Sequence, residues 1–533
     1  MRSDPSTLLL RNAAIGTDGP DRGGADSLLV GDGLIRWIGR ADDAPVADRV
    51  IDVGGSRVVP GLTDAHAHLY TRALELLHVR LADAASIADL LARLQRACAA
   101  GSPGEWIVSS DYSELVLAEH RHPLRAEIDA VSAGRPVLLR RTGGHLAVAN
   151  SAALQAAGFD DTSVDPVGGT LGRVGGRLSG VLAESAADIA AALAPPPSRD
   201  RTAAAIRAVA RECLSLGIVS VVEAAVGFSS GFDAEWAVWN VLRDAGDFPL
   251  RMGFMLRLDP DDARQRGLRP SAVDPRWQIR TLKFFVDGII GARTAALSAP
   301  YADTDTSGLF MEAPEALRAK VIAAHADGWQ LAAHVIGDRA IAHWLDCLAA
   351  AQAVAPRPDP RHRLEHFALP GPQAVQQVKA LGAVVVPQHG FLHRLGASFA
   401  AAVGPERAQH LYPGRTLLAA GVRFAGSSDL PIGPLSPFVG MAAAVSRTTA
   451  NGMVLAAHEA LTRTEALASY AEGGPFVMEQ EASRGRLAVG QLADLAVLDR
   501  DVMTCAPDDT AAARSRLTVI GGAVAFSDGT MAS

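Results

Sequence analysis

The chain has 533 residues, of which 49% are hydrophobic and 20% are charged, and its formal net charge is −8. This composition is typical of a globular protein and excludes a disordered chain. The mildly acidic charge, without a basic run, argues against binding to nucleic acids or anionic membranes. Four cysteines lie far apart with no CxxC pair, so we expect free thiols in a cytoplasmic protein. No apolar stretch approaches the length of a membrane-spanning helix.

Both ends of the chain are predicted to form short β-strands. A Gly-Asp-Gly turn signal at 31–33 separates two apolar runs near the N-terminus. A Gly-Gly pair at 521–522 separates two similar runs near the C-terminus. Since neither end is long enough to bury a core by itself, we expect residues 1–57 and 475–533 to pair into one composite β-sandwich domain.

The middle of the chain, residues 58–474, alternates short apolar runs with Ala/Leu-rich stretches of helical periodicity. Several runs are apolar throughout, as strands buried on both faces of a parallel sheet are. The expected strands are 58–63, 218–223, 250–256, 279–286, 330–334, 363–366, 383–387 and 422–426. The expected helices include 201–216, 315–326, 341–351 and 372–381. This alternation predicts an α/β fold, specifically a (β/α)8 TIM barrel.

One gap interrupts the alternation, because the stretch between the first two expected strands is far too long for a structureless loop. The stretch ends at the helix breaker Pro195-Pro196-Pro197. We therefore expect residues from about 70 to 197 to form a large subdomain inserted after the first barrel strand.

Two histidines close the first expected strand, in the segment VVPGLTDAHAHLY. His66 and His68 are two residues apart, a spacing that places two side chains on the same face of a strand. At the C-terminal end of a barrel strand, where active sites form, a pair of imidazoles suits a metal such as zinc. HxH alone is weak evidence, because two loop histidines give the same pattern.

Other metal-capable side chains close later strands. His334, His366 and Asp429 each follow an apolar run and precede a loop. Any one of them alone fits a core or loop residue. Their recurrence at successive strand ends favours a metal site at the mouth of the barrel.

Together these residues resemble the metal-dependent amidohydrolase superfamily, and above all its YtcJ-like branch, which includes N-substituted formamide deformylase-like enzymes. The resemblance rests on segments spread over nearly the whole chain in family order. They are PGLTDAHAH, PVLLRRTGGHLAVANSAAL, GGRLSGVLAESA, TLKFFVDGIIGARTAAL, AAHVIGDRAI, RLEHF, VPQHG, GSSDLPI and GRLAVGQLADLAVLDRD.

The resemblance implies a hydrolase of non-peptide C–N bonds that acts on a small amide, such as an N-acyl amine, an N-formyl amine or a cyclic amide. It also implies a barrel with a composite β domain, and it makes a homodimer plausible. One or two zinc ions, or other divalent metals, would be bound by a set of ligands, namely His66, His68, Lys283, His334, His366 and Asp429.

Lys283 matches a lysine that is carboxylated in many members of the superfamily. A protonated ammonium is repelled by zinc, whereas the anionic carbamate can bridge two metals. Alternatively, Lys283 is uncarboxylated and points elsewhere. Its apolar neighbours Leu282 and Phe284 argue against a lysine whose charge simply extends into solvent.

The implied ligand set predicts the mechanism. Zinc lowers the pKa of a bound water toward about 7, and the resulting hydroxide attacks the carbonyl. Asp429 would take the proton of that water and then protonate the leaving nitrogen. Two rivals remain: a lyase or isomerase that uses the same site for proton abstraction, and a non-catalytic regulatory module.

Three further residues are candidates for contacts with the substrate. His145, in the insertion, is expected to reach the substrate or the oxyanion, although a turn histidine fits equally well. Arg293 could bind a substrate carboxylate or carbonyl, or form a structural salt bridge. His389 closes the seventh strand and could line the pocket. Glu365 could be a hydrogen-bond partner of a ligand imidazole, but because neighbouring side chains alternate along a strand, we expect it to face the helices rather than the site.

Overall fold

The computed structural model describes residues 7–16, 24–100, 104–141, 146–271 and 274–531. The chain divides into two compact units, one made of Met1–Leu69 with Arg207–Ser533 and the other of Tyr70–Ile206. The first unit contains the barrel and the sheets formed by the chain ends, and the second is the inserted subdomain. Among the described residues, no helix has the length and apolar character needed to cross a membrane.

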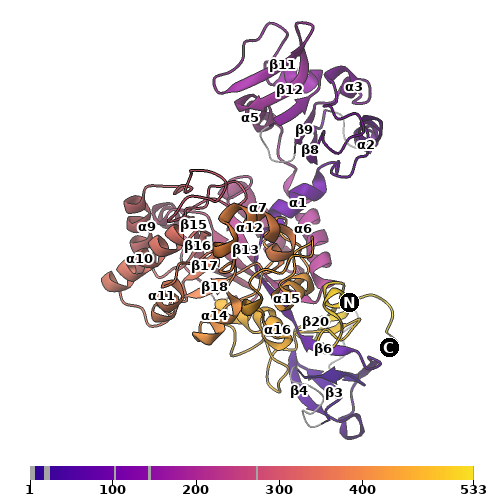
Figure 1. Ribbon diagram of the computed structural model, residues 1–533. Helices are drawn as coiled ribbons and strands as arrows, with labels where there is room; N and C mark the ends of the chain where they lie inside the picture. Colours follow the sequence, from indigo (N-terminus) through magenta and orange to yellow (C-terminus); the bar gives the residue numbers. More distant parts are fainter. Residues whose placement is uncertain (1–6, 17–23, 101–103, 142–145, 272–273, 532–533) are drawn as a thin grey trace. The chain divides into compact units, whose positions relative to one another are not determined.

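A parallel sheet of seven strands forms the barrel, in the spatial order β18-β17-β16-β15-β14-β13-β7 (Figure 1). Its strands are β7 (Leu62–Ala67), β13 (Ile218–Val226), β14 (Arg251–Leu256), β15 (Trp277–Phe285), β16 (Gln330–Val335), β17 (Arg363–His366) and β18 (Val384–Val386). These strands are almost entirely buried, as parallel strands covered on both faces must be. The predicted α/β barrel class is confirmed.

Helices follow the barrel strands, and Figure 1 shows α9, α10 and α11 beside β15 to β18. The helices of the barrel and its flanks are α6 (Arg199–Leu214), α7 (Phe232–Ala245), α8 (Pro260–Gln265), α9 (Pro314–Ala326), α10 (Asp338–Val354), α11 (Ala374–Ala380), α12 (Gly390–Val403), α13 (Pro405–Ala408), α14 (Gly414–Ala419), α15 (Pro437–Ser446), α16 (Arg463–Ala471), α17 (Gly473–Val477) and α18 (Pro507–Ala511). The four helices expected from periodicity are present as α6, α9, α10 and α11, with ends shifted by a few residues.

The first expected barrel strand is in fact two strands. β6 (Arg57–Pro60) pairs with β19 (Leu495–Leu498) in the composite domain, and β7 begins only at Leu62. The break lies at Gly61, where an added Cβ would be 2.6 Å from a methyl carbon of Val219. A glycine therefore lets the chain pass close to β13 as it leaves one domain for the other.

The eighth expected strand is not a regular strand. It forms an isolated parallel bridge between Phe424 and Val385, next to β18. On its other side, the N–H of Ala65 in β7 donates to the carbonyl of Gly426 at 3.2 Å. The N–H of Gly426 donates to Ser469, outside the sheet, which breaks the ladder. The segment thus closes the barrel through single hydrogen bonds rather than a continuous strand.

The two chain ends form one small domain of two sheets, as predicted. The sheets have the orders β4-β3-β1-β5 and β2-β6-β19-β20-β21, so the second combines strands from both ends. The remaining strands are β1 (Thr7–Arg11), β2 (Ala14–Ile15), β3 (Ser27–Gly31), β4 (Leu34–Gly39), β5 (Arg49–Asp52), β20 (Ser515–Ile520) and β21 (Ala523–Ser527). The hairpin between β3 and β4 turns at Asp32 and Gly33, both with positive φ, which matches the expected turn.

The inserted unit has its own five-stranded sheet, in the order β11-β12-β10-β9-β8. Its elements are α1 (Leu69–Leu77), α2 (Ile87–Ala100), β8 (Ile107–Tyr112), α3 (Arg125–Asp129), β9 (Val137–Arg141), β10 (Leu146–Ala149), α4 (Ser151–Ala156), β11 (Gly169–Val174), β12 (Arg177–Glu184) and α5 (Ser185–Leu193). Two buried apolar clusters pack helices against this sheet, so the insertion is a folded subdomain and not a loop.

Candidate metal centre

The register of the barrel strands places several polar side chains inside the barrel. Residues in register on adjacent parallel strands share a face of the sheet. Ala332 belongs to a buried apolar cluster with members from most of the barrel strands, so its face is the barrel interior. Lys283 is in register with Ala332, and Phe285 is in register with His334. The side chains of Lys283, Phe285 and His334 therefore face the barrel interior as well.

Four histidine rings and one aspartate meet at the C-terminal ends of these strands. The ring centre of His66 lies 5.5 Å from that of His68 and 5.1 Å from that of His366. The rings of His334 and His366 are 4.4 Å apart. The Oδ1 atom of Asp429 lies 3.3 Å from Nε2 of His66 and 3.2 Å from Nε2 of His68. In the described part of the chain, His66, His366 and Asp429 offer ligand atoms that all lie within 4.8 Å of one another.

Glu365 faces the barrel interior, so the expectation that it faces the helices is wrong. Its carboxylate accepts a hydrogen bond from Nδ1 of His66 at 2.5 Å, and two more from Arg363 at 2.7 and 3.1 Å. Glu365 is in register with His334 and so holds the inward position of β17, whereas His366 departs from simple alternation, with a φ of 72° in the left-handed region. With the backbone turned there, two consecutive side chains both reach the site.

Gln388 orients a second histidine of the cluster. Its Oε1 atom lies 2.7 Å from Nδ1 of His366, while its Nε2 donates to Val386 O and Ser427 Oγ, each at 3.0 Å. Because the amide nitrogen is used elsewhere, the atom that faces His366 must be the acceptor oxygen. His366 therefore carries its proton on Nδ1 and keeps Nε2 free for the cluster. The sequence pattern pointed to His389 and not to Gln388, although both lie in the loop after β18, beyond Pro387.

The donor set fits a divalent metal. His66 lies between two carboxylates, with Nδ1 2.5 Å from Glu365 and Nε2 3.3 Å from Oδ1 of Asp429, and a ring with one proton on Nδ1 presents the acceptor Nε2 to the acceptor Oδ1. Two acceptors at this distance repel each other unless a cation lies between them. Burial lowers the pKa of His334 to about 4 and holds that of His366 well below its usual range. Neutral imidazoles are the form that binds metals.

Two charged groups complete the electrostatics of the cluster. Burial opposes ionisation of Asp429, but the imidazoles of His66 and His68 beside it outweigh burial and hold the pKa of this carboxyl well below its usual range. Burial also lowers the pKa of the Lys283 amine to about 8. The site thus combines neutral imidazoles, an ionised carboxylate and a lysine that loses its proton readily.

The structure places the remaining predicted residues as follows. Arg293 forms an ion pair with Asp303, and its guanidinium also donates to the carbonyl of Gly291 at 2.7 Å. His389 is buried, with its ring 5.8 Å from that of Phe424. His145 lies outside the described residues. The substrate contacts assigned to these three residues remain predictions.

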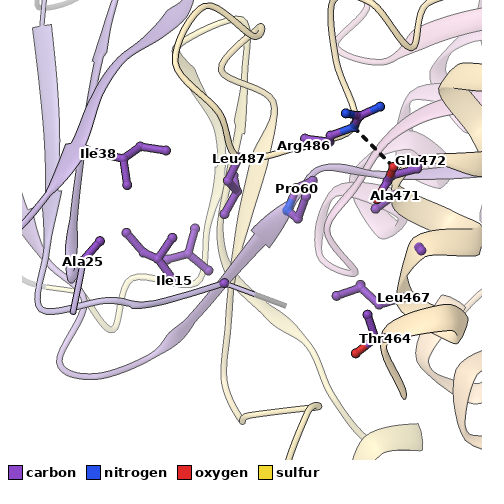
Figure 2. A pocket seen from close by; sticks show the side chains of 14 residues that line it. Ile15, Ala25, Ile38, Pro60, Thr464, Leu467, Ala471, Glu472, Arg486 and Leu487 are labelled. Carbon is purple, nitrogen blue, oxygen red and sulfur yellow. Dashed lines mark ion pairs between the residues drawn. The ribbon is translucent and has the colours of Figure 1, made fainter. Parts of the chain in front are cut away.

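A hollow of about 320 Å³ lies elsewhere in the same unit, beside β6 and α16. Figure 2 shows the apolar side chains of Ile15, Leu487 and Leu467 around it, with an ion pair between Arg486 and Glu472. None of the predicted metal ligands lines this hollow, so it is separate from the histidine cluster.

Comparisons with known proteins agree with this geometry. Residues 49–526 match the amidohydrolase family. An N-substituted formamide deformylase of Arthrobacter pascens is 29% identical, over 97% of this chain and 98% of its own length. A protein of Bacillus subtilis named as an amidohydrolase, YtcJ, is 26% identical over 94% of this chain and 96% of its own.

Solved structures lead to the same conclusion. An uncharacterized metal-dependent hydrolase from Pyrococcus horikoshii is 26% identical, with a TM-score of 0.77 over 94% of this chain and 99% of that one. A metal-dependent hydrolase from Pyrococcus furiosus, also uncharacterized, has a TM-score of 0.76 at 26% identity, over 93% of this chain and 100% of that one. The family match covers most of the sequence, and the barrel carries a buried set of metal-capable ligands at its mouth. The chain therefore belongs to the amidohydrolase family and is a metal-dependent hydrolase of C–N bonds.

Proposed function

We propose that this enzyme hydrolyses a non-peptide amide bond in a small molecule, namely an N-acyl amine, an N-formyl amine or a cyclic amide. The observation that carries the proposal is the approach of two buried imidazoles, from His66 and His68, to one oxygen of Asp429. Similarity to an N-substituted formamide deformylase over nearly the full length of both chains supports an N-formyl amine within this range.

The cluster would hold one or two divalent cations, with zinc the first candidate for imidazole and carboxylate ligands. The residues that would hold them are His66, His68, Lys283, His334, His366 and Asp429. A bound cation supplies Lewis acidity, which polarises the amide carbonyl and acidifies a water.

Asp429 moves the proton in the proposed reaction. Its carboxylate is ionised, so it can accept a proton from the attacking water and later deliver it to the leaving nitrogen. Its N–H donates to the carbonyl of His66 at 2.7 Å, which fixes the carboxylate next to the imidazoles. Glu365 and Gln388 are positioning residues, because each holds the Nδ1 proton of one histidine and leaves Nε2 free.

We further propose that Lys283 is carboxylated. With a pKa lowered to about 8 by burial, part of the amine is neutral near physiological pH and can attack carbon dioxide. An N–C bond forms, one proton leaves to solvent, and the product is a carbamate anion. This step turns a cation that repels metals into an anion that attracts them.

Metal analysis combined with turnover tests the proposal. Wild type and Lys283→Ala, purified without added metal, are compared by inductively coupled plasma mass spectrometry and assayed on a panel of N-formyl amines, N-acyl amines and cyclic amides. We expect about two metal ions per wild-type chain, as in two-metal hydrolases, and fewer in the variant. Reaction in H₂¹⁸O should place the label in the acid product. Metal without any turnover, or product without label, would contradict amide hydrolysis.

A cytoplasmic location and a homodimer are proposed as well. The location is supported by the four cysteines, which are all free, three of them buried. Light scattering of the purified enzyme tests the dimer, and fractionation of the source cells tests the location.

A further inference from the structure

Three consecutive barrel strands end in a cluster of two aromatic rings and one guanidinium. Phe228 follows β13, Arg257 follows β14, and Phe285 is the last residue of β15. The rings of Phe228 and Phe285 are stacked, with centres 5.6 Å apart and planes inclined by 16°. The guanidinium carbon of Arg257 lies 5.7 Å from the first ring centre and 5.5 Å from the second. We call these three residues the mouth cluster.

The mouth cluster is in direct contact with the predicted metal ligands. The ring of Phe228 lies 5.5 Å from that of His68, and the ring of Phe285 lies 5.7 Å from that of His334. The Nζ atom of Lys283 is 5.3 Å from the centre of the Phe285 ring. A single aromatic ring, Phe228 or Phe285, separates Arg257 from the nearest histidine of the metal centre. A small substrate could therefore contact Arg257 and the metal ligands at the same time.

The loop that carries Phe228 is held rigidly in place. The buried carboxylate of Glu235, on α7, accepts the backbone N–H groups of Gly227, Ser229 and Ser230, each at 2.7 Å. Phe228 nevertheless leaves 48% of its surface exposed. Hydrogen bonds to a carboxylate are among the stronger ones in proteins, so this exposed ring is preorganised. A preorganised exposed aromatic ring beside an active site is suited to binding a ligand.

Arg257 is exposed, and although its backbone N–H donates to the carbonyl of Val226 at 3.0 Å, its guanidinium forms no hydrogen bond or ion pair with the described residues. The positive charge of Arg257 acts on the carboxylate of Glu235 at long range, but this carboxylate forms its hydrogen bonds with three backbone N–H groups instead. Arg293, the arginine that the sequence suggested for substrate binding, differs because it is paired with Asp303. The cation–π contacts orient the guanidinium of Arg257 and leave its N–H donors available to an anion.

We propose that Phe228, Arg257 and Phe285 form a subsite for a carboxylate group of the amide substrate. The preferred substrates are then N-acyl or N-formyl amino acids, or similar amides with a carboxylate a few bonds from the scissile C–N bond. Arg257 binds the carboxylate through its paired donors, and the two rings contact the apolar part of the substrate. This inference rests on the proposed amide hydrolysis and adds the substrate class.

A matched pair of substrates tests the subsite. N-formylphenylalanine and N-formyl-2-phenylethylamine differ only in the carboxylate, so the ratio of their kcat/KM values isolates its contribution. We expect wild type to favour the carboxylate form, and Arg257→Met to reduce the ratio by about 10- to 100-fold, the range for a lost charged hydrogen bond. The matched control is Arg266→Met, because Arg266 also lies over a phenylalanine, Phe232, at 5.0 Å but is paired with Asp233. The control should keep the wild-type ratio.

The failure of this inference can be distinguished from the failure of the proposed function. If wild type hydrolyses both compounds and Arg257→Met leaves the ratio unchanged, the subsite is wrong and amide hydrolysis stands. If neither compound is hydrolysed, calorimetry on the same proteins decides: the dissociation constant of N-formylphenylalanine should rise by a similar factor in Arg257→Met alone. No difference in that constant, or no binding, would overturn the subsite.

Discussion

Glu365 is the residue whose replacement most directly tests how the metal ligands are held. The carboxylate is buried and accepts hydrogen bonds from His66 at 2.5 Å and from Arg363 at 2.7 and 3.1 Å. Glu365→Gln preserves the shape but replaces one acceptor oxygen by an NH₂ donor. If this NH₂ faces His66, the imidazole must move its proton to Nε2 and cannot bind a metal. If it faces Arg363, donor groups oppose each other in a buried site.

Two magnitudes follow from this geometry. Loss of a carboxylate that orients a ligand imidazole lowers metal affinity by about 10- to 100-fold, or about 1.4 to 2.7 kcal/mol. Arg363 is 1% exposed and would lose its counter-charge, which lowers the free energy of unfolding by about 3–5 kcal/mol. We expect both losses in Glu365→Gln. Metal affinity is measured by competition with a chelating dye, and stability by urea unfolding in excess EDTA.

Asp494→Asn is the matched control. Asp494, just before β19, is a buried carboxylate that pairs at 2.7 and 3.0 Å with the buried Arg251, the first residue of β14, whereas the metal centre lies at the C-terminal ends of the barrel strands. This variant should lose stability to a similar extent but bind metal like wild type. If Glu365→Gln also binds metal with wild-type affinity, the argument that Glu365 sets the tautomer of His66 is refuted.

Three further outcomes are expected. Gln388→Leu removes the oxygen that accepts the Nδ1 proton of His366, so metal affinity should fall by about tenfold in the same dye competition. His325 and His362 are buried and joined by a ring-to-ring hydrogen bond of 2.8 Å, and burial lowers the pKa of both below 6.5. The unfolded chain therefore binds more protons below about pH 6.5, and the free energy of unfolding should fall by up to about 1.4 kcal/mol per pH unit and ring as the pH decreases. Urea unfolding at roughly pH 7.5 and pH 5.5 should show a smaller decrease in His362→Asn, and an equal decrease would contradict the assignment. Trp239 is fully buried against three aromatic rings, so Trp239→Ala should lower the free energy of unfolding by about 3–5 kcal/mol in urea, with metal content unchanged.

The barrel and the identity of the clustered histidines could be predicted because both depend on local patterns. A strand buried on both faces appears as a continuous apolar run, and the residue that ends the run lies at the C-terminal edge of the barrel. His66, His334 and His366 occupy such positions, so the sequence alone indicated that they meet. The break at Gly61, which divides the first expected strand into β6 and β7, was harder to predict, because it depends on how close β13 comes to the backbone there.

The partners of these histidines were decided only by the tertiary structure. Glu365 meets His66 across the barrel, from a strand 299 positions away in sequence, and the left-handed backbone at His366 brings that neighbouring ring into the same site. Likewise, Phe228 and Arg257 come together because adjacent strands end at the same level. A run of hydrophobic residues determines at which edge of the sheet a side chain lies. Hydrogen bonds and ring contacts instead require distances of 3 to 6 Å between residues far apart in sequence, and only the folded barrel sets those distances.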